Sequence, residues 1–421
     1  MTKYRTLDHL VLPIIAWDPE RPAEWINNHI AMVFATSNSY VVTGDDGDVI
    51  INTTSAAQSP HARRNFEALL GRPVKPAKII FTQSHPDHIG GWQTFADTGA
   101  EMIGQRMFRQ ICDERNMLGG FFATRNRNVL SAMIPPGTPD LAWFATPDPE
   151  PLTTFDDTME FTVSGRRYQL ISLPSGETLD GLGVWMPDEK TLFTGNWAGA
   201  IYGALPNFYT ARGDRDRSIP RWLSDCDRLP ALEPELLVTG HERPIEGAAH
   251  IRETLGKVRE AVQYIHDETV KGMVSGVTLP EIQAKLALPD DLTPRDGRCK
   301  PHWIARSVWE EYSGWFRQER TSELYPTPPS AIWSELADMA GGAGALIDKA
   351  RTYLGAGDLE KALHFIEIAV AAEPDNRAVR ETELEVLNAL ADDTEGRVFD
   401  LLGWLEGRIT SAQTAMSGTA A

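Results

Sequence analysis

Cysteine is scarce in this chain. Its three copies, Cys112, Cys226 and Cys299, lie far apart and form no Cys-x-x-Cys pair. Their odd number and wide spacing argue against a disulfide framework and against a thiolate zinc site. We interpret all three as small apolar residues of the folded core.

Long apolar runs are also absent. No segment of about 18 consecutive apolar residues occurs, so we expect no membrane span. The first residues contain neither an uninterrupted apolar stretch nor a small-residue cleavage site. We therefore expect no signal peptide and a cytoplasmic location.

Positive charge is in deficit. The 40 Lys and Arg residues are outnumbered by 59 Asp and Glu residues, which gives a formal net charge of −19. Such a surface repels phosphate backbones and anionic membranes, so we expect neither nucleic acid nor membrane as a partner. An anionic substrate would need a local group of arginines to overcome this background field.

The 421 residues are 42% apolar, which is enough for two or three domains with cores of their own. Strand-like and helix-like patterns alternate up to about residue 246 and predict a layered α/β architecture. From Gly247 the pattern is helical, whereas Thr410–Ala421 is small and polar and is expected to fray. The proline-rich segment 135–151 is interpreted equally well as a lid of the substrate cleft or as a surface excursion.

The most informative stretch is Phe81–Trp92, which follows an apolar strand-like run and contains His85, Asp87 and His88 before Gly-Gly. Two imidazoles and a carboxylate so close together are costly to bury unless something binds them. Neutral nitrogen and anionic oxygen are the ligand mixture that a zinc-like ion accepts. The alternative is a polar loop whose histidines hydrogen-bond to their neighbours.

Further strand-like runs also end on polar residues. Glu177, Asn196 and His241 each lie just beyond such a run. Loops that leave a rigid sheet edge can bring such side chains together into one site. Taken singly, Glu177 could be a helix-start acid and His241 an ordinary loop histidine.

The loop Gln83–His88 resembles the His-x-His-x-Asp-His loop of the metallo-β-lactamase superfamily, with Gln83 in place of its first histidine. The segments around Glu177 and Asn196 resemble those that carry two acidic ligands in the linear alkyl sulfatases. Asn196 stands where the second, metal-bridging acid would be. His241 matches the late metal histidine of the same family.

The segment Asn207–Arg217 is similar to the sulfate-side arginine segment of the alkyl sulfatases. Residues from Ala305 onward resemble their dimerisation domain. The resemblance implies substrate-binding roles for Asn207, Tyr209, Arg212 and Arg217. The alternative for the two arginines is that they lie in an exposed charged loop.

The resemblance implies an α/β (α+β) fold in which a metallo-β-lactamase αββα sandwich at 1–247 precedes an all-helical dimerisation domain. That domain would occupy 248–400, with a tetratricopeptide-like hairpin, and a tail would follow at 401–421. It also implies a homodimer. A sterol-carrier-like domain usually follows in these sulfatases, and the chain stops before it, which weakens the expectation of a long-chain substrate.

The resemblance also implies two metal positions. The first would use Gln83, His85 and Glu177, the second Asp87, His88 and His241, with Asn196 between them. Because amide oxygens are neutral and weak zinc donors, we expect one zinc per chain, held at the second position. Asn52, where the superfamily usually has a supporting aspartate, is expected to weaken metal binding further.

The expected function is metal-dependent hydrolysis of a small sulfate ester or a related ester-like or ether-like bond. Asp87 and Glu177 would be the catalytic residues, with Glu177 as general base for a water that the metal activates. One alternative is a lyase or another hydrolase of the same fold that uses one metal or none. The other is a degenerate, non-catalytic partner subunit.

Overall fold

The computed structural model describes residues 21–96, 99–130, 147–208, 211, 213, 217–295 and 299–418. The chain forms two compact units. The larger unit contains Val11–Arg125 and Ile134–Tyr312, and the smaller one contains Ser313–Ala421 with two short pieces from earlier in the chain. Each unit is described by itself.

The larger unit is built on two β-sheets. The first has seven strands in sequential order, antiparallel from β1 to β4 and parallel from β4 to β7. Its strands are β1 (Glu24–Trp25), β2 (Ile30–Val33), β3 (Ser39–Val42), β4 (Asp48–Ile51), β5 (Pro76–Ile80), β6 (Glu101–Gln105) and β7 (Leu152–Phe155).

The second sheet has the order β13-β12-β11-β10-β9-β8, and all its neighbours are antiparallel except β11 and β12. Its strands are β8 (Thr158–Val163), β9 (Arg166–Ser172), β10 (Leu182–Met186), β11 (Thr191–Gly195), β12 (Leu236–Thr239) and β13 (Ile245–Glu246).

The period-two alternation of the strands builds the layers. Val49 and Ile51 of β4 face the apolar core between the sheets, together with Val184 and Phe193 of the second sheet. Ile50, the residue between them, points to the opposite face and packs in the helix-side core. Successive strand residues point to opposite sides, so one strand serves two cores.

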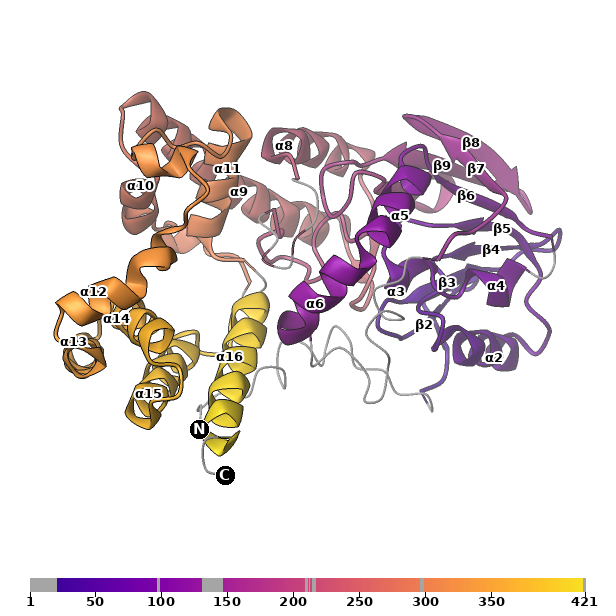
Figure 1. The fold of residues 1–421 in the computed structure, drawn as a ribbon. Helices are drawn as coiled ribbons and strands as arrows, with labels where there is room; N and C mark the ends of the chain where they lie inside the picture. The colour runs from indigo at the N-terminus through magenta and orange to yellow at the C-terminus, as the bar shows by residue number, and fades with distance from the viewer. Residues whose placement is uncertain are drawn as a thin grey trace. The chain divides into compact units, whose positions relative to one another are not determined.

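Helices cover the outer face of each sheet (Figure 1). The first sheet carries α2 (Ser59–Leu70), α4 (Trp92–Phe95) and α5 (Phe108–Met117). The second packs on α8 (Ile219–Arg228), α9 (Ala248–Val274) and α11 (Pro301–Ser313). The expected αββα sandwich is therefore confirmed. The remaining helices of this part of the chain are α3 (Pro86–Ile89), α6 (Gly119–Leu130), η3 (Pro187–Glu189), η4 (Pro230–Leu232), α10 (Leu279–Lys285) and η5 (Asp290–Leu292).

Some of the helices that follow residue 247 pack on the sandwich. Leu255, Val262 and Ile265 of α9 share an apolar cluster with Trp222 of α8. The compact units consequently divide near Ser313. The domain boundary expected after residue 247 stays a prediction.

The smaller unit is helical. It contains η6 (Thr321–Leu324), η7 (Pro329–Ile332), α12 (Trp333–Met339), α13 (Ala343–Gly355), α14 (Leu359–Ala372), α15 (Arg377–Asp393) and α16 (Phe399–Gly418). The pair α13 and α14 forms the expected hairpin around Gly357, which has a positive φ of 77°. The expectation of a frayed end from Thr410 is wrong up to residue 418, because buried Leu402, Leu405 and Ile409 anchor α16 on α15 at helical spacing.

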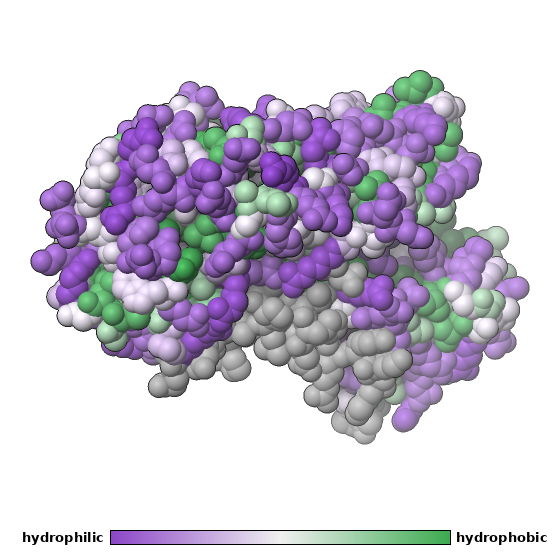
Figure 2. All heavy atoms as spheres, turned by 180° about the vertical axis from the view of Figure 1, so that it is seen from behind, coloured by the Kyte–Doolittle hydropathy of each residue, from purple (hydrophilic) through white to green (hydrophobic). Residues whose placement is uncertain are grey.

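Hydrophilic residues cover most of the face shown in Figure 2. Within the described residues, no helix is long and apolar enough to cross a membrane.

Trp222 supports the outer face of the second sheet. Its side chain is fully buried, stacks on Trp197 at a centroid distance of 5.6 Å and donates a hydrogen bond to the Trp197 carbonyl oxygen. We predict that Trp222→Ala lowers the free energy of unfolding of the larger unit by about 3–5 kcal/mol. Denaturant unfolding followed by circular dichroism checks this. Trp25→Ala, at an exposed tryptophan of the same unit, is the control and should cost less than about 1 kcal/mol.

Candidate metal centre

Asp87 and His88 lie in the short helix α3, which begins directly after β5 and its loop. His85 occupies the N-cap position, and Pro86 takes the first helical position, where its fixed φ fits and its missing N–H is not needed. One short turn thus presents His85, Asp87 and His88 together beyond the strand end. His88 is fully buried, whereas Asp87 is partly exposed.

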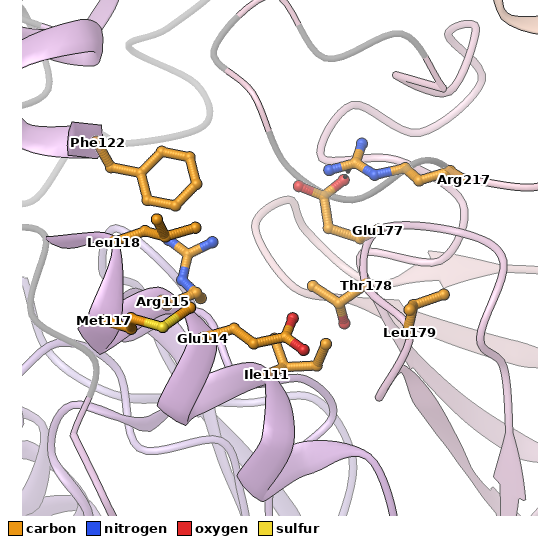
Figure 3. A pocket seen from close by; sticks show the side chains of 10 residues that line it. All are labelled: Ile111, Glu114, Arg115, Met117, Leu118, Phe122, Glu177, Thr178, Leu179 and Arg217. Atoms are coloured by element: carbon orange, nitrogen blue, oxygen red, sulfur yellow. Dashed lines mark ion pairs between the residues drawn. The ribbon is translucent and has the colours of Figure 1, made fainter. Parts of the chain in front are cut away.

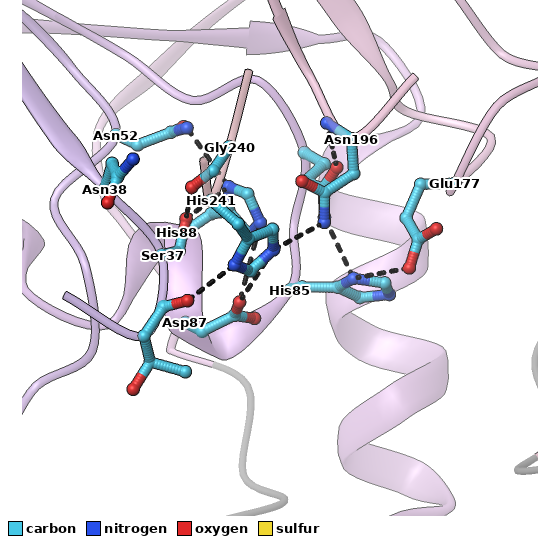
Figure 4. A network of polar contacts seen from close by, with 12 residues as sticks. Ser37, Asn38, Asn52, His85, Asp87, His88, Glu177, Asn196, Gly240 and His241 are labelled. Carbon is cyan, nitrogen blue, oxygen red and sulfur yellow. Dashed lines mark hydrogen bonds and ion pairs between the residues drawn. The ribbon is translucent and has the colours of Figure 1, made fainter. Parts of the chain in front are cut away.

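Other strand ends meet α3 at this edge of the sandwich (Figure 4). His241 follows β12, Asn196 follows β11, and Glu177 follows β9. Gly240 makes the approach close, because a Cβ there would lie 2.2 Å from Asn196 Oδ1 and 2.8 Å from His88 Cε1. The expected convergence of the strand ends is present in the structure.

Asp87, His88 and His241 form a cluster that can hold a metal ion, with one ligand atom from each within 4.8 Å of the others. Asp87 Oδ2 lies 3.5 Å from His88 Nε2 and 3.8 Å from His241 Nε2. His88 Nε2 is buried and has no hydrogen-bond partner among the described residues. A buried, unsatisfied imidazole nitrogen facing a carboxylate and a second imidazole fits the ligand set of one zinc-like ion.

His241 is oriented to offer Nε2. Its Nδ1 donates a hydrogen bond to the carbonyl oxygen of Thr36 at 2.5 Å, so Nε2 carries the lone pair, which accepts a hydrogen bond from the Asn196 amide that a metal ion would have to displace. A backbone carbonyl that fixes the tautomer in this way is a usual support of a metal-bound histidine. The amide nitrogen of Asn196 lies 3.0 Å from the same Nε2.

The two hydrogen-bonding neighbours of His88 Nδ1 differ in the tautomer of the ring that they favour. Its Nδ1 faces Ser37 Oγ and Asn52 Nδ2, each at 3.0 Å. The backbone N–H of Thr82 donates to Asn52 Oδ1, which fixes the Asn52 amide and turns its N–H2 toward His88. Ser37 Oγ donates to Gly240 O and can accept a hydrogen bond from Nδ1–H, but the Asn52 N–H2 opposes the Nδ1–H tautomer that metal binding through Nε2 requires.

Burial lowers the pKa of His88 to about 4, against the smaller raising effect of Asp87. The ring is therefore neutral at neutral pH, which is the form that binds metal.

The other group of expected ligands is linked by contacts among its own members and with Arg217. The backbone N–H of Asn196 donates to Gln83 Oε1, so Gln83 Nε2 is the atom that lies 2.9 Å from His85 Nδ1. Glu177 Oε1 is 3.8 Å from His85 Nδ1, and Glu177 Oε2 is 3.3 Å from Arg217 Nη1. The guanidinium thus supplies positive charge beside Glu177, and the neutral Gln83 N–H2 occupies the acceptor face of His85 Nδ1.

A cavity of about 320 Å³ opens beside Glu177 and Arg217 (Figure 3). Their side chains are 2% exposed in Arg217 and 4% exposed in Glu177, so they form a buried ion pair in the cavity wall. The remaining lining residues are Ile111, Glu114, Arg115, Met117, Leu118, Phe122, Thr178 and Leu179.

The structure places some of the expected substrate-binding residues at the cavity and does not describe others. Arg217 lines the cavity but is paired with Glu177, and its guanidinium also donates to the carbonyl oxygen of the buried Asn207. Tyr209 and Arg212 lie outside the described residues, as does most of the proline-rich segment 135–151. Sequence reasoning missed the α5–α6 wall of the cavity, which carries no motif.

Two parts of the chain match known protein families. Residues 33–241 match the metallo-beta-lactamase superfamily, and residues 278–399 match the alkyl sulfatase dimerisation family. This chain joins a metallo-β-lactamase domain to an alkyl sulfatase dimerisation domain. The recognition made from the loop around His85 and from the later helical segments is confirmed.

The chain's curated relatives are alkylsulfatases. A Pseudomonas linear primary-alkylsulfatase is 26% identical over 391 residues, which is 86% of this chain and 70% of the relative. A Saccharomyces cerevisiae alkyl/aryl-sulfatase is 24% identical over 408 residues, 88% of this chain and 61% of the relative. The chain therefore spans between about three fifths and seven tenths of these relatives.

A solved structure shares the fold. The inverting sec-alkylsulfatase Pisa1 from Pseudomonas sp. superposes with a TM-score of 0.78 at 22% identity, over 94% of this chain and 65% of that one. The metallo-β-lactamase fold with a helical domain after it is thereby confirmed independently of the site residues.

The Asn52 amide leads to a prediction about metal affinity. We expect Asn52→Asp to tighten metal binding about 10- to 100-fold, because a carboxylate can accept a hydrogen bond from His88 Nδ1–H, whereas the amide N–H2 opposes that tautomer. Asn52 has a φ of 58°, a conformation that aspartate also tolerates. Competition with a chromophoric chelator measures the affinity. An unchanged or weaker affinity would contradict the orientation of the amide described above.

Asp180 predicts a pH dependence of stability. It is fully buried at the end of the Glu177 loop, and burial raises its pKa from 3.8 to about 6, against smaller lowering effects of the neighbouring Thr178 and Ser84 hydroxyl groups. Because the folded state holds this proton more tightly, the stability that Asp180 contributes falls between about pH 4 and pH 6 and is lost above that range.

Relative to that of Asp180→Asn, the free energy of unfolding of wild type should therefore fall by about 3 kcal/mol between pH 4 and pH 7. Denaturant unfolding of both proteins at several pH values measures it, with Asp290→Asn at an exposed site as control. A pH-independent difference would show that Asp180 ionises normally.

Proposed function

We propose that the chain is a zinc-dependent hydrolase that cleaves a small sulfate ester, with one ion per chain held by Asp87, His88 and His241. The observation that supports this is the convergence of those three side chains, with buried His88 Nε2 unsatisfied. Glu177, which lies 3.8 Å from His85 of the neighbouring ligand group, lines a cavity. The alkylsulfatase relatives support the choice of a sulfate ester.

A divalent ion at this position supplies Lewis acidity and lowers the pKa of a water molecule toward about 7. Glu177 is buried in the cavity wall and serves as the base that accepts the proton of the attacking water. Arg217 holds the Glu177 carboxylate in place through their ion pair. Attack of water breaks the C–O or the O–S bond of the ester and gives an alcohol and sulfate, and the proton held by Glu177 passes to the leaving oxygen or to solvent.

A single ion is favoured over two because of the Gln83 amide. With Gln83 Oε1 turned to the Asn196 N–H, the Gln83 N–H2 faces His85 Nδ1, where a second ion would need a donor atom. Arg217 compensates Glu177, the only carboxylate that the first position would have among its expected ligands. Both features oppose a second cation.

We also propose a homodimer, in line with the alkyl sulfatase dimerisation match at 278–399. Large apolar side chains of this region, including Trp315 and Tyr325, are exposed in the single chain. Burial of such side chains between two copies is the usual driving force of a stable dimer. The cytoplasmic location stays a prediction.

The test measures metal and activity on the same preparations. Zinc-loaded wild type should contain about one equivalent per chain and should hydrolyse a short alkyl sulfate such as hexyl sulfate. Asp87→Asn should lose both properties. Glu177→Gln should keep the metal, but its kcat should fall at least about 100-fold, as expected for a lost general base. Glu101→Gln, at an exposed position, is the matched control.

Two equivalents of tightly held zinc would contradict the single-ion site, and chelator-resistant hydrolysis would contradict metal dependence. A further variant separates an active site from a degenerate one. If hydrolysis appears only in the double variant Gln83→His/Asn196→Glu, the natural chain is not a sulfatase.

A further inference from the structure

The loop between β2 and β3 contacts both histidines of the metal cluster. The carbonyl oxygen of Thr36 accepts a hydrogen bond from His241 Nδ1. Ser37 Oγ lies 3.0 Å from His88 Nδ1 and donates to the carbonyl oxygen of Gly240 (Figure 4). The placement of this loop therefore affects the orientation of both rings and the nitrogen on which each carries its proton.

Gln58 holds this loop through Thr36. The backbone N–H of Thr36 donates to Gln58 Oε1 at 3.0 Å, and Gln58 Nε2 donates to Thr36 Oγ1 at 2.8 Å. The two bonds hold one residue by its backbone and by its side chain, so they fix the orientation of Thr36 relative to α2, whose N-cap is Gln58. Gln58 is 6% exposed, and its burial limits competition from water for both bonds.

Gln58 also contacts a second loop, which joins β4 to α2. Thr54 Oγ1 donates to the same Gln58 Oε1 at 3.0 Å. Thr54 is fully buried and has a φ of 54°, a conformation that a β-branched residue rarely adopts and that surrounding contacts must maintain. In the same loop, Asn52 Nδ2 lies 3.0 Å from His88 Nδ1. One buried amide thus connects the two loops that contact His88 and His241.

We propose, resting on the proposed function with its single zinc ion, that Gln58 is a positioning residue of the metal centre. By fixing Thr36, Gln58 directs the Thr36 carbonyl oxygen to His241 Nδ1. That acceptor keeps the proton of the neutral ring on Nδ1 and the lone pair on Nε2, the atom that faces Asp87. Without the Gln58 amide the Thr36 carbonyl group turns away, and the ring gains access to the Nε2–H tautomer, which cannot bind an ion through Nε2.

The Asn196 amide does not fix the tautomer of His241 by itself. Its Nδ2 lies 3.0 Å from His241 Nε2, but its Oδ1 has no hydrogen-bond partner among the described residues. The amide can therefore turn and accept a hydrogen bond from Nε2–H without giving up another bond. The Thr36 carbonyl oxygen can only accept, so it is the group that selects the tautomer.

A purely structural role for Gln58 gives a different expectation. Buried amides commonly satisfy backbone groups of neighbouring loops, and their loss then lowers the stability of the fold alone. Gln105 is a matched case in the same unit. It is 4% exposed, its Nε2 donates to the carbonyl oxygen of Asp156, and its Oε1 accepts from the Met107 N–H. Neither partner belongs to the loops that contact the two histidines, so Gln105→Met is the control for Gln58→Met.

The first measurement uses the metal-free protein, so it depends on neither zinc nor activity. Long-range nitrogen–proton correlation NMR spectra at about pH 8, above the ordinary pKa of histidine, show which ring nitrogen carries the proton. The His241 signals are those that are absent from His241→Gln. Wild type and Gln105→Met should carry the proton on Nδ1, whereas Gln58→Met should populate the Nε2–H tautomer.

The second measurement is the affinity for zinc, by competition with a chromophoric chelator. Gln58→Met should weaken zinc binding about 10- to 100-fold, as for the lost support of a metal-bound histidine. Gln105→Met should stay within about threefold of wild type, as for a change outside the site. Thr36→Val removes only the oxygen that accepts from Gln58 Nε2. It should weaken binding less, and in the double variant it should add nothing to Gln58→Met, because both changes break the same contact.

An unchanged His241 tautomer in Gln58→Met, or a zinc affinity equal to that of wild type, would overturn the role of Gln58 and leave the proposed zinc site standing. Equal weakening in Gln58→Met and Gln105→Met would also overturn it, since it would reflect a general loss of stability. If wild type binds no zinc, the proposed function fails, and the His241 tautomer in the metal-free proteins decides the inference. If Gln58→Met does not fold, Thr36→Val replaces it: a shifted tautomer supports the inference, and a wild-type tautomer overturns it.

Discussion

The site depends on the burial of imidazole and carboxylate groups at one edge of a β-sandwich. His88 and His241 are held against Asp87 by strand ends that the two sheets fix in place, and His88 Nε2 has no protein partner among the described residues. Leaving such an atom unsatisfied costs free energy that a bound cation would recover. The positions of Asn52, Asn196 and Gly240 all follow from the close approach of these strand ends.

The amides next to this cluster change what the fold can bind. Backbone N–H groups fix the orientation of Gln83 and of Asn52, and in both residues the amide N–H2 faces a histidine nitrogen. At His85 the result is a hydrogen bond where a metal ligand is expected, and at His88 it is opposition to the tautomer that binds metal. These two substitutions therefore favour one ion of reduced affinity over a pair of ions.

Much of the fold could be predicted from the sequence, because strand alternation and the loop around His85 are local patterns. The strand-like run expected before the His85 loop is β5, and the runs expected before Asn196 and His241 are β11 and β12. The Glu177–Arg217 pair, the Thr36 carbonyl bound to His241 and the α5–α6 wall depend on tertiary contacts between distant segments, which no local pattern specifies. The end of α16 was missed because small polar residues conceal the spacing of its buried apolar ones.

The central claim is that one cation binds where Asp87, His88 and His241 converge. Anomalous diffraction at the zinc absorption edge from crystals of the zinc-loaded protein tests it most directly. The account predicts a single strong peak bounded by Asp87, His88 Nε2 and His241 Nε2. A second peak of equal height between His85 and Glu177, or the absence of a peak at the three predicted ligands, would contradict it.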